Sequence, residues 1–112
     1  LALLSHSGSR GLGAAIAKHY SLLAREVCRL PREAQHFAWL DLNTEEGQEY
    51  WMSMNLAGDY ARACHERIHL NLAKALGLKP LANVNNHHNF AWKEEITPGR
   101  MAIVHRKGAT PA

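Results

Sequence analysis

The chain has 112 residues, a net charge of +3 with neutral histidines, and a pI near 9.1. A chain of this length forms one domain at most. Because it opens on a leucine and stops soon after a basic turn, we expect residues 1–112 to be a single partial domain, a piece of a longer protein. The mild positive charge suits an acidic partner such as RNA without requiring one. The eight histidines are more informative, since imidazole is the commonest metal ligand.

Cysteine usage and hydropathy exclude several classes of protein. Cys28 and Cys64 lie in helix-like segments without a short pairing motif, which argues against a zinc knuckle or a disulfide framework. The longest uncharged stretch near the start, residues 12–17, is too short to span a bilayer, and no signal peptide is present. We therefore expect a soluble, cytoplasmic protein with no membrane partner.

The first half of the chain predicts a strand and a helix. Residues 1–4 form a continuous apolar run that ends in a Ser-Gly-Ser turn, which is typical of a buried strand. From Ala14 to Leu30, apolar residues recur at spacings of three and four, and Pro31 follows. This pattern predicts an amphipathic helix that ends at the proline.

A second and longer helix is predicted after Asn43 or Thr44, either of which can cap it. The glutamates at 45–46 then lie at the positive end of the helix dipole. Helical apolar spacing continues to Gly77, which gives a length of about 48 Å at ~1.5 Å per residue if the helix is unbroken. Gly58 is the position where we expect a bend.

The last third of the chain predicts two strands. Polar residues alternate over 81–92 with a period of two, 97–99 is a Thr-Pro-Gly turn, and 101–104 is a short apolar run. The expected fold class is α+β, in the order strand, glycine-rich loop, two helices and two strands.

Three polar blocks lie beside the strand-like runs: His6-Ser7-Gly8-Ser9-Arg10-Gly11-Leu12-Gly13, Asn86-His87-His88-Asn89 and His105-Arg106-Lys107-Gly108. They gather imidazoles, a glycine-rich turn and cations where strands are expected to end. Such residues favour a metal and phosphate site. Taken alone, each block also fits a purely structural role, as an ordinary turn, a loop histidine with its hydrogen bonds made, or a solvent-exposed strand edge.

Local geometry refines two of these blocks. The glycine-rich turn would leave backbone N–H groups free at a helix N-terminus, where Arg10 can also face a phosphate, although the glycine spacing matches neither a Walker loop nor the dinucleotide fingerprint. In the second block, His87 and His88 point to opposite faces of an extended chain, so only one can face the same site as His6.

A separate motif, His65-Glu66-Arg67-Ile68-His69, matches the zinc peptidase pattern on a helix. Arg67 places a charge between the two histidines, no third ligand can be assigned, and histidine is frequent enough here for chance matches. A zinc hydrolase that uses His65, Glu66 and His69 therefore stays an alternative of lower rank.

The three polar blocks in this order resemble the RtcB family of RNA ligases. The apolar residues of the long helix are similar too, namely Tyr50, Met54, Ala57, Tyr60, Ala61 and Ile68. The resemblance covers essentially the whole chain, which would correspond to about the middle quarter of a full-length member. It implies a fragment of the RtcB fold.

The resemblance also implies an activity. Members of the family join RNA ends that carry a 2′,3′-cyclic phosphate or 3′-phosphate to 5′-hydroxyl ends, in tRNA splicing or RNA repair, using GTP and two manganese ions. A histidine is guanylylated and GMP passes to the RNA 3′-phosphate, which the 5′-hydroxyl then attacks.

Residue by residue, the resemblance implies that His6 and His88 are manganese ligands. His88 and Asn89 would lie at the guanine nucleotide, and His87 would be structural. Arg10 would hold an RNA phosphate as a catalytic residue.

The third block would contribute Arg106 and Lys107 to the RNA phosphate path, with Lys107 also catalytic. The chain departs from the family at Cys64-His65, where Asn-Arg is common, which suggests a divergent bacterial branch. The family's Asp and Cys ligands, a further histidine ligand and the guanylylated histidine have no match here. We therefore expect this piece to be inactive alone, and keep a non-catalytic RNA-binding or structural module as the main alternative.

Overall fold

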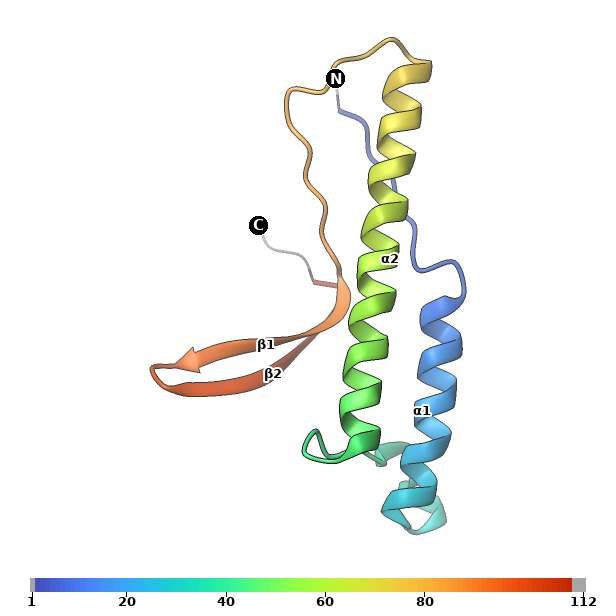
Figure 1. Cartoon of the computed structure of the whole chain (residues 1–112), viewed down its shortest axis with the longest axis vertical. Helices are drawn as coiled ribbons and strands as arrows, with labels where there is room; N and C mark the ends of the chain where they lie inside the picture. The colour runs from blue at the N-terminus through green and yellow to red at the C-terminus, as the bar shows by residue number, and fades with distance from the viewer. Residues whose placement is uncertain (1, 110–112) are drawn as a thin grey trace.

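The computed structural model describes residues 2–109, and the remaining four residues lie outside the described part. Its elements are helix α1 (Leu12–Cys28), a short 3-10 helix η1 (Arg32–Phe37), helix α2 (Glu45–Ala75), strand β1 (Asn89–Thr97) and strand β2 (Arg100–Lys107). Figure 1 shows α1 alongside one half of α2 and the β1–β2 hairpin projecting away from both helices. The predicted α+β class is confirmed, with η1 as an addition.

Helix α2 forms where capping and apolar spacing predict it. Thr44 is the N-cap, and its side chain accepts a hydrogen bond from the Gly47 backbone N–H. The helix ends at Ala75, just before Gly77, whose positive φ of 65° ends the regular backbone. Figure 1 shows α2 without a sharp kink, and its helix is continuous through Gly58.

Helix α1 runs antiparallel to α2 and packs against it through small side chains (Figure 1). Ala24 of α1 and Ala57 and Ala61 of α2 are buried. The Tyr20 hydroxyl lies 3.3 Å from the Ser53 hydroxyl across this contact. The prediction that Pro31 ends α1 is wrong by two residues, because Arg29 already takes a left-handed conformation with φ 46°.

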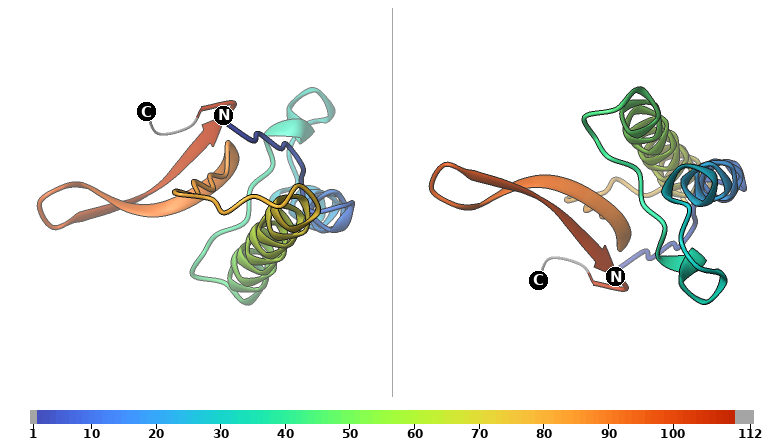
Figure 2. Two further views of the ribbon diagram at one scale, coloured as in Figure 1. Left: turned by 90° about the horizontal axis from the view of Figure 1, so that it is seen from above. Right: turned by 90° about the horizontal axis from the view of Figure 1, so that it is seen from below.

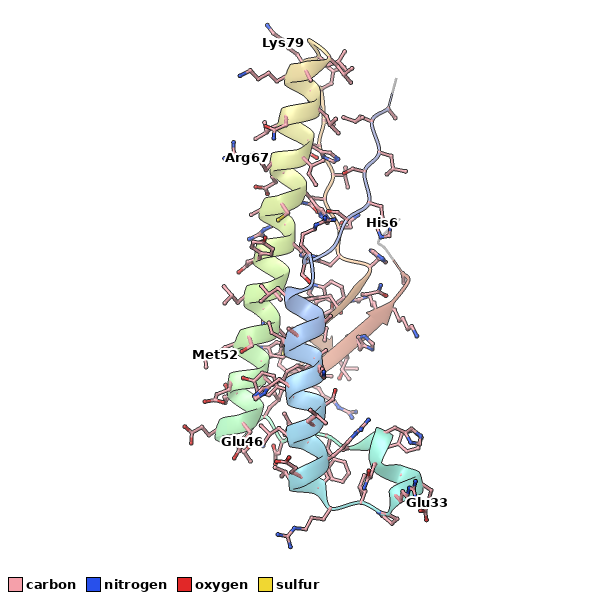
Figure 3. The ribbon with its side chains drawn as sticks, turned by 90° about the vertical axis from the view of Figure 1, so that its right-hand side faces the viewer. His6, Glu33, Glu46, Met52, Arg67 and Lys79 are labelled. Carbon is pink, nitrogen blue, oxygen red and sulfur yellow. The ribbon has the colours of Figure 1, made fainter. Side chains whose placement is uncertain are left out.

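Two segments predicted as strands do not pair. The strand expected over 1–4 is absent from residues 2–4, and Leu1 lies outside the described residues. The strand expected over 81–92 begins only at Asn89. Residues 2–9 and 82–88 instead run without regular secondary structure along the C-terminal half of α2, as Figures 1 and 3 show. Ser5, Ser7, Asn83 and Asn85 of these segments bond to the His65 and His69 side chains of α2.

The two strands form an antiparallel hairpin whose register runs from Asn89 opposite Lys107 to Thr97 opposite Arg100. The predicted turn at 97–99 is confirmed, with Gly99 at a φ of 77°. Strand β2 is longer than the predicted 101–104, because its basic end pairs with β1. Figure 2 shows the hairpin extending sideways from the helices. Over residues 2–109, no helix has both the length and the apolar character needed to cross a bilayer.

Candidate metal centre

The centre of the candidate site is a contact between His6 and His88. Their Nε2 atoms are 3.2 Å apart and their ring centroids 4.8 Å apart, although 82 residues separate them in the chain. Two nitrogens that each lie about 2.1 Å from one ion, at an angle of about 90° to 110°, are about 3.0 to 3.4 Å apart. The two imidazoles therefore fit adjacent positions on a single metal ion.

Local structure holds His88 from the hairpin side. Its carbonyl oxygen accepts a hydrogen bond from the Gly108 N–H at 2.6 Å, and the Asn89 side-chain oxygen lies 2.9 Å from the same nitrogen. Phe90 packs against α2 at Gly58, where a Cβ would come within 2.7 Å of the Phe90 ring. The start of β1 therefore packs against α2, and the lack of a side chain at Gly58 allows the Phe90 ring to approach the helix closely.

The glycine-rich turn before α1 differs from its predicted form. Ser9 accepts hydrogen bonds from two backbone N–H groups of the first turn, at 3.1 Å from Leu12 to the Ser9 carbonyl and at 2.8 Å from Gly13 to the Ser9 hydroxyl. These two groups are therefore not free for a phosphate. Arg10 and Gly11 take positive φ values of 54° and 97°, and Arg10 is exposed.

A cavity of about 590 Å³ adjoins the two histidines. His6, His88 and Asn89 line it, together with His105 of β2 and residues of α1 and α2. The predicted cations do not line this cavity. Arg10 and Lys107 lie exposed outside it, so the structure does not bring them to the imidazole pair. His105 lines it too, and the only signal for this residue in the sequence is its place in the third polar block.

Arg106 does not line this cavity, and its guanidinium contacts Glu94 and Trp92 instead. Its guanidinium makes two hydrogen bonds to the Glu94 carboxylate, at 2.6 and 2.7 Å, and its Cζ lies 5.0 Å from the ring centroid of Trp92. The hydrogen bonds from Arg106 hold the pKa of the Glu94 carboxyl below its usual range, and the same bonds raise the pKa of Arg106. An RNA phosphate would have to compete with Glu94 for this guanidinium.

The His87 ring makes different contacts from the ring of His88. Its ring stacks on Phe90 with centroids 5.1 Å apart, whereas His88 faces His6. Burial lowers the pKa of His87, and the nearby charges of His65 and Arg62 lower it further. These contacts fit the structural role that the sequence analysis expected.

The histidines of the zinc peptidase pattern are engaged elsewhere. His65 contacts the Ser7 carbonyl oxygen and the Asn85 side chain, and His69 contacts the Ser5 hydroxyl and the Asn83 side chain. Within residues 2–109, no group of three or more His, Cys, Asp or Glu side chains is arranged to hold a metal ion. Both rings therefore fasten segments of the chain rather than turn toward a shared ion.

Comparison with known proteins places the chain in a family. The family model for the tRNA-splicing ligase RtcB matches residues 1–112, so the chain belongs to the RtcB family. It is 31% identical to a tRNA-splicing ligase RtcB from Methanococcus maripaludis and 33% identical to one from Methanocaldococcus jannaschii. It is 32% identical to an RNA-splicing ligase RtcB homolog from Entamoeba dispar.

These alignments use nearly all of the chain but little of the relatives. They cover 98% of this chain in each case, and 26%, 13% and 23% respectively of the three relatives. The chain thus spans about a quarter or less of the length of the relatives it matches. No solved structure is significantly similar to it.

Proposed function

We propose that this chain is a central part of a GTP- and manganese-dependent RNA ligase, referred to below as the parent protein. It would join RNA ends bearing a 2′,3′-cyclic phosphate or 3′-phosphate to 5′-hydroxyl ends. Membership of the RtcB family supports the reaction class. The 3.2 Å separation of the His6 and His88 nitrogens is the observation that carries the metal site.

In this proposal the residues near the imidazole pair have distinct tasks. His6 and His88 hold one manganese ion, which when bound neutralises charge on the transferring phosphoryl group. The Asn89 side-chain oxygen is occupied by Gly108, so its amide nitrogen is the group that remains to donate to the guanine nucleotide.

The basic side chains would act outside the cavity. Arg10 and Lys107 are exposed and would contact the RNA phosphates outside the cavity, as catalytic residues only if the bound RNA brings the reacting phosphate to them. Arg106 would join this path only when a phosphate displaces Glu94 from its guanidinium. The proposed partners are RNA and GTP.

The first test is His88→Ala in the parent protein. The loss of one imidazole ligand should weaken manganese binding strongly and abolish transfer of GMP from labelled GTP to the protein, because the metal neutralises the phosphates in that step. Unchanged GMP transfer would refute the metal role of His88. His36→Ala is the matched control, because His36 lies in η1, at the far end of α1 from His6.

Manganese stoichiometry separates the alternatives. A non-catalytic RNA-binding or structural module would retain no manganese, whereas the ligase should retain it. A zinc hydrolase built on His65 and His69 would regain activity with zinc after metal stripping. The hydrogen bonds of both rings argue against that alternative.

A further inference from the structure

We propose that His65 and His69 are positioning residues that clamp the two segments carrying His6 and His88 onto α2. The purpose that we give to these two residues rests on the proposed function, whereas their contacts do not depend on it. The two histidines are one helical turn apart, so their side chains share a face of α2. We call them the histidine clamp.

Each ring of the histidine clamp bridges both segments. His65 Nε2 lies 2.8 Å from the Ser7 carbonyl oxygen, and His65 Nδ1 lies 3.1 Å from Asn85 Oδ1. His69 Nε2 lies 2.8 Å from the Ser5 hydroxyl, and its Nδ1 lies 3.3 Å from Asn83 Oδ1. A carbonyl oxygen can only accept, so the Nε2 of His65 carries a proton. The Nδ1 of the neutral ring is then an acceptor, and it bonds to Asn85 when that side-chain amide presents its NH2 group.

Side chains alternate in direction along an extended chain, so these bonds also determine which way the neighbouring side chains point. In the first segment, the Ser5 side chain points to His69, so the His6 side chain next to it points to the opposite side of the extended chain. Ser7 is held through its backbone carbonyl oxygen. In the second segment, positions 83 and 85 contact the clamp, and His88, three residues on from 85, points away. The two imidazoles meet beside a cavity that His65 also lines, so one clamp residue borders the proposed metal site.

Within residues 2–109, no strand pairing holds residues 5–7 and 83–86 against α2. The only strand pairing described there begins at Asn89 opposite Lys107, after His88. The hairpin and the Phe90 contact hold the second segment from its end. Residues 5–7 are bonded to α2 through the Ser5 hydroxyl and the Ser7 carbonyl oxygen, which contact His69 and His65.

An imidazole suits this task because it has two polar atoms on different edges of a rigid ring. One nitrogen can reach one segment while the other reaches the second, and only two side-chain torsions have to be ordered. The clamp also explains the alternating asparagines of 83–86, whose odd members bond to α2. It accounts for the zinc peptidase spacing without a metal.

The test uses the parent protein and begins without metal. In His65→Ala and His69→Ala variants, the backbone NMR order parameters of residues 5–7 and 83–86 should fall below about 0.6, as in flexible chain, while those in the middle of α2 stay at about 0.85. With manganese added, the dissociation constant should rise about 10- to 100-fold, because outer residues orient the ligands. The melting temperature should change little by comparison.

Two further variants sharpen the test. His65→Gln keeps a side-chain N–H that can reach the Ser7 carbonyl, so it should recover most of the manganese affinity that His65→Ala loses. Glu66→Ala is the matched control, because Glu66 lies exposed on α2 between the two clamp residues. Glu66→Ala should change neither the order parameters nor metal binding, whereas a zinc hydrolase would need Glu66.

Different outcomes separate the clamp from the ligase. Unchanged order parameters in both alanine variants would overturn the clamp, whatever the wild-type protein binds. Lower order parameters in a parent protein that binds no manganese would support the clamp and refute the metal site. If His65→Ala does not fold, Ser5→Ala removes one partner of His69 from outside the helix, and unchanged order parameters of residues 5–7 there would also overturn the proposal.

Discussion

Glu94 on β1 and Arg106 on β2 form an ion pair diagonally across the hairpin, since Glu94 lies opposite Ala102 and Arg106 opposite Phe90. This pair changes what the basic end of β2 can do. The pair is about one third exposed on both sides, and the guanidinium also lies over Trp92. A cation that looks free in the sequence is therefore already bound by a carboxylate. Lys107, next along the strand, is exposed and lies opposite Asn89.

The lowered pKa of Glu94 gives a prediction for pH. A carboxylate whose pKa is lower in the folded than in the unfolded state contributes stability above the unfolded value, and that contribution is lost as the pH falls through the folded value. We expect the Glu94 titration, followed by NMR in the parent protein, to have its midpoint below about 4.5. Hairpin amides should lose protection over the same acidic range.

Substitution identifies the cause of this shift. Arg106→Gln should raise the Glu94 midpoint toward the value of a free glutamate, since hydrogen bonding by Arg106 is the largest cause. Lys93→Gln is the control, because it removes a neighbouring positive charge from β1 that makes no ion pair with Glu94. An unchanged midpoint in Arg106→Gln would show that the ion pair does not persist in solution.

Between elements, the close contact of α2 with β1 depends on Gly58. A Cβ at this position would lie 2.7 and 2.9 Å from two atoms of the Phe90 ring, closer than van der Waals contact permits. Phe90 follows His88 by two residues, so the fit between a glycine and an aromatic ring helps to set the position of a proposed ligand. A helix bend is not needed to explain the glycine.

Gly58→Ala should therefore destabilise the parent protein. Overpacking costs about 1 to 3 kcal/mol, which exceeds in most cases the roughly 1 kcal/mol that alanine contributes to helix formation. We expect a net loss of about 1 kcal/mol in the free energy of unfolding, measured by denaturant titration. In a Phe90→Ala background the same change should become neutral or stabilising, because the ring is gone. A loss of equal size in both backgrounds would contradict this account.

At the scale of the whole molecule, little apolar surface is buried. Among residues 2–109 the buried apolar residues are the alanines at 24, 57, 61 and 73, while Phe37 and Trp39 are 70% and 62% exposed. The radius of gyration is 17.6 Å, against about 13 Å expected for a compact domain of this length. The helices and hairpin thus form a spread-out structure with a small core.

The 112-residue chain expressed alone should accordingly lack a cooperative thermal transition. Its core is too small to offset the conformational entropy of folding, so we expect a broad melt by circular dichroism and binding of a hydrophobic dye. The parent protein, as control, should melt sharply and bind little dye. A sharp transition without dye binding in the isolated chain would show that its core is sufficient.

Local signals in the sequence determined the helices and the turn. The Thr44 cap, the apolar spacing of α2 and the glycine near its end are properties of neighbouring residues, and the structure follows them closely. The turn at 97–99 likewise depends on residues adjacent in the chain. Alternation also predicted that His87 and His88 would face different ways, which agrees with their different ring contacts.

Only the tertiary structure decided what the extended segments and the cations contact. A period of two indicates an extended chain but not its partner, so the sequence predicts a strand over 81–92 although Asn83 and Asn85 bond to His69 and His65. The engagement of Arg106 by Glu94 depends on the hairpin register in the same way. Helices and turns form from contacts close in sequence, whereas the meeting of His6 with His88 requires segments 82 residues apart to lie on one helix.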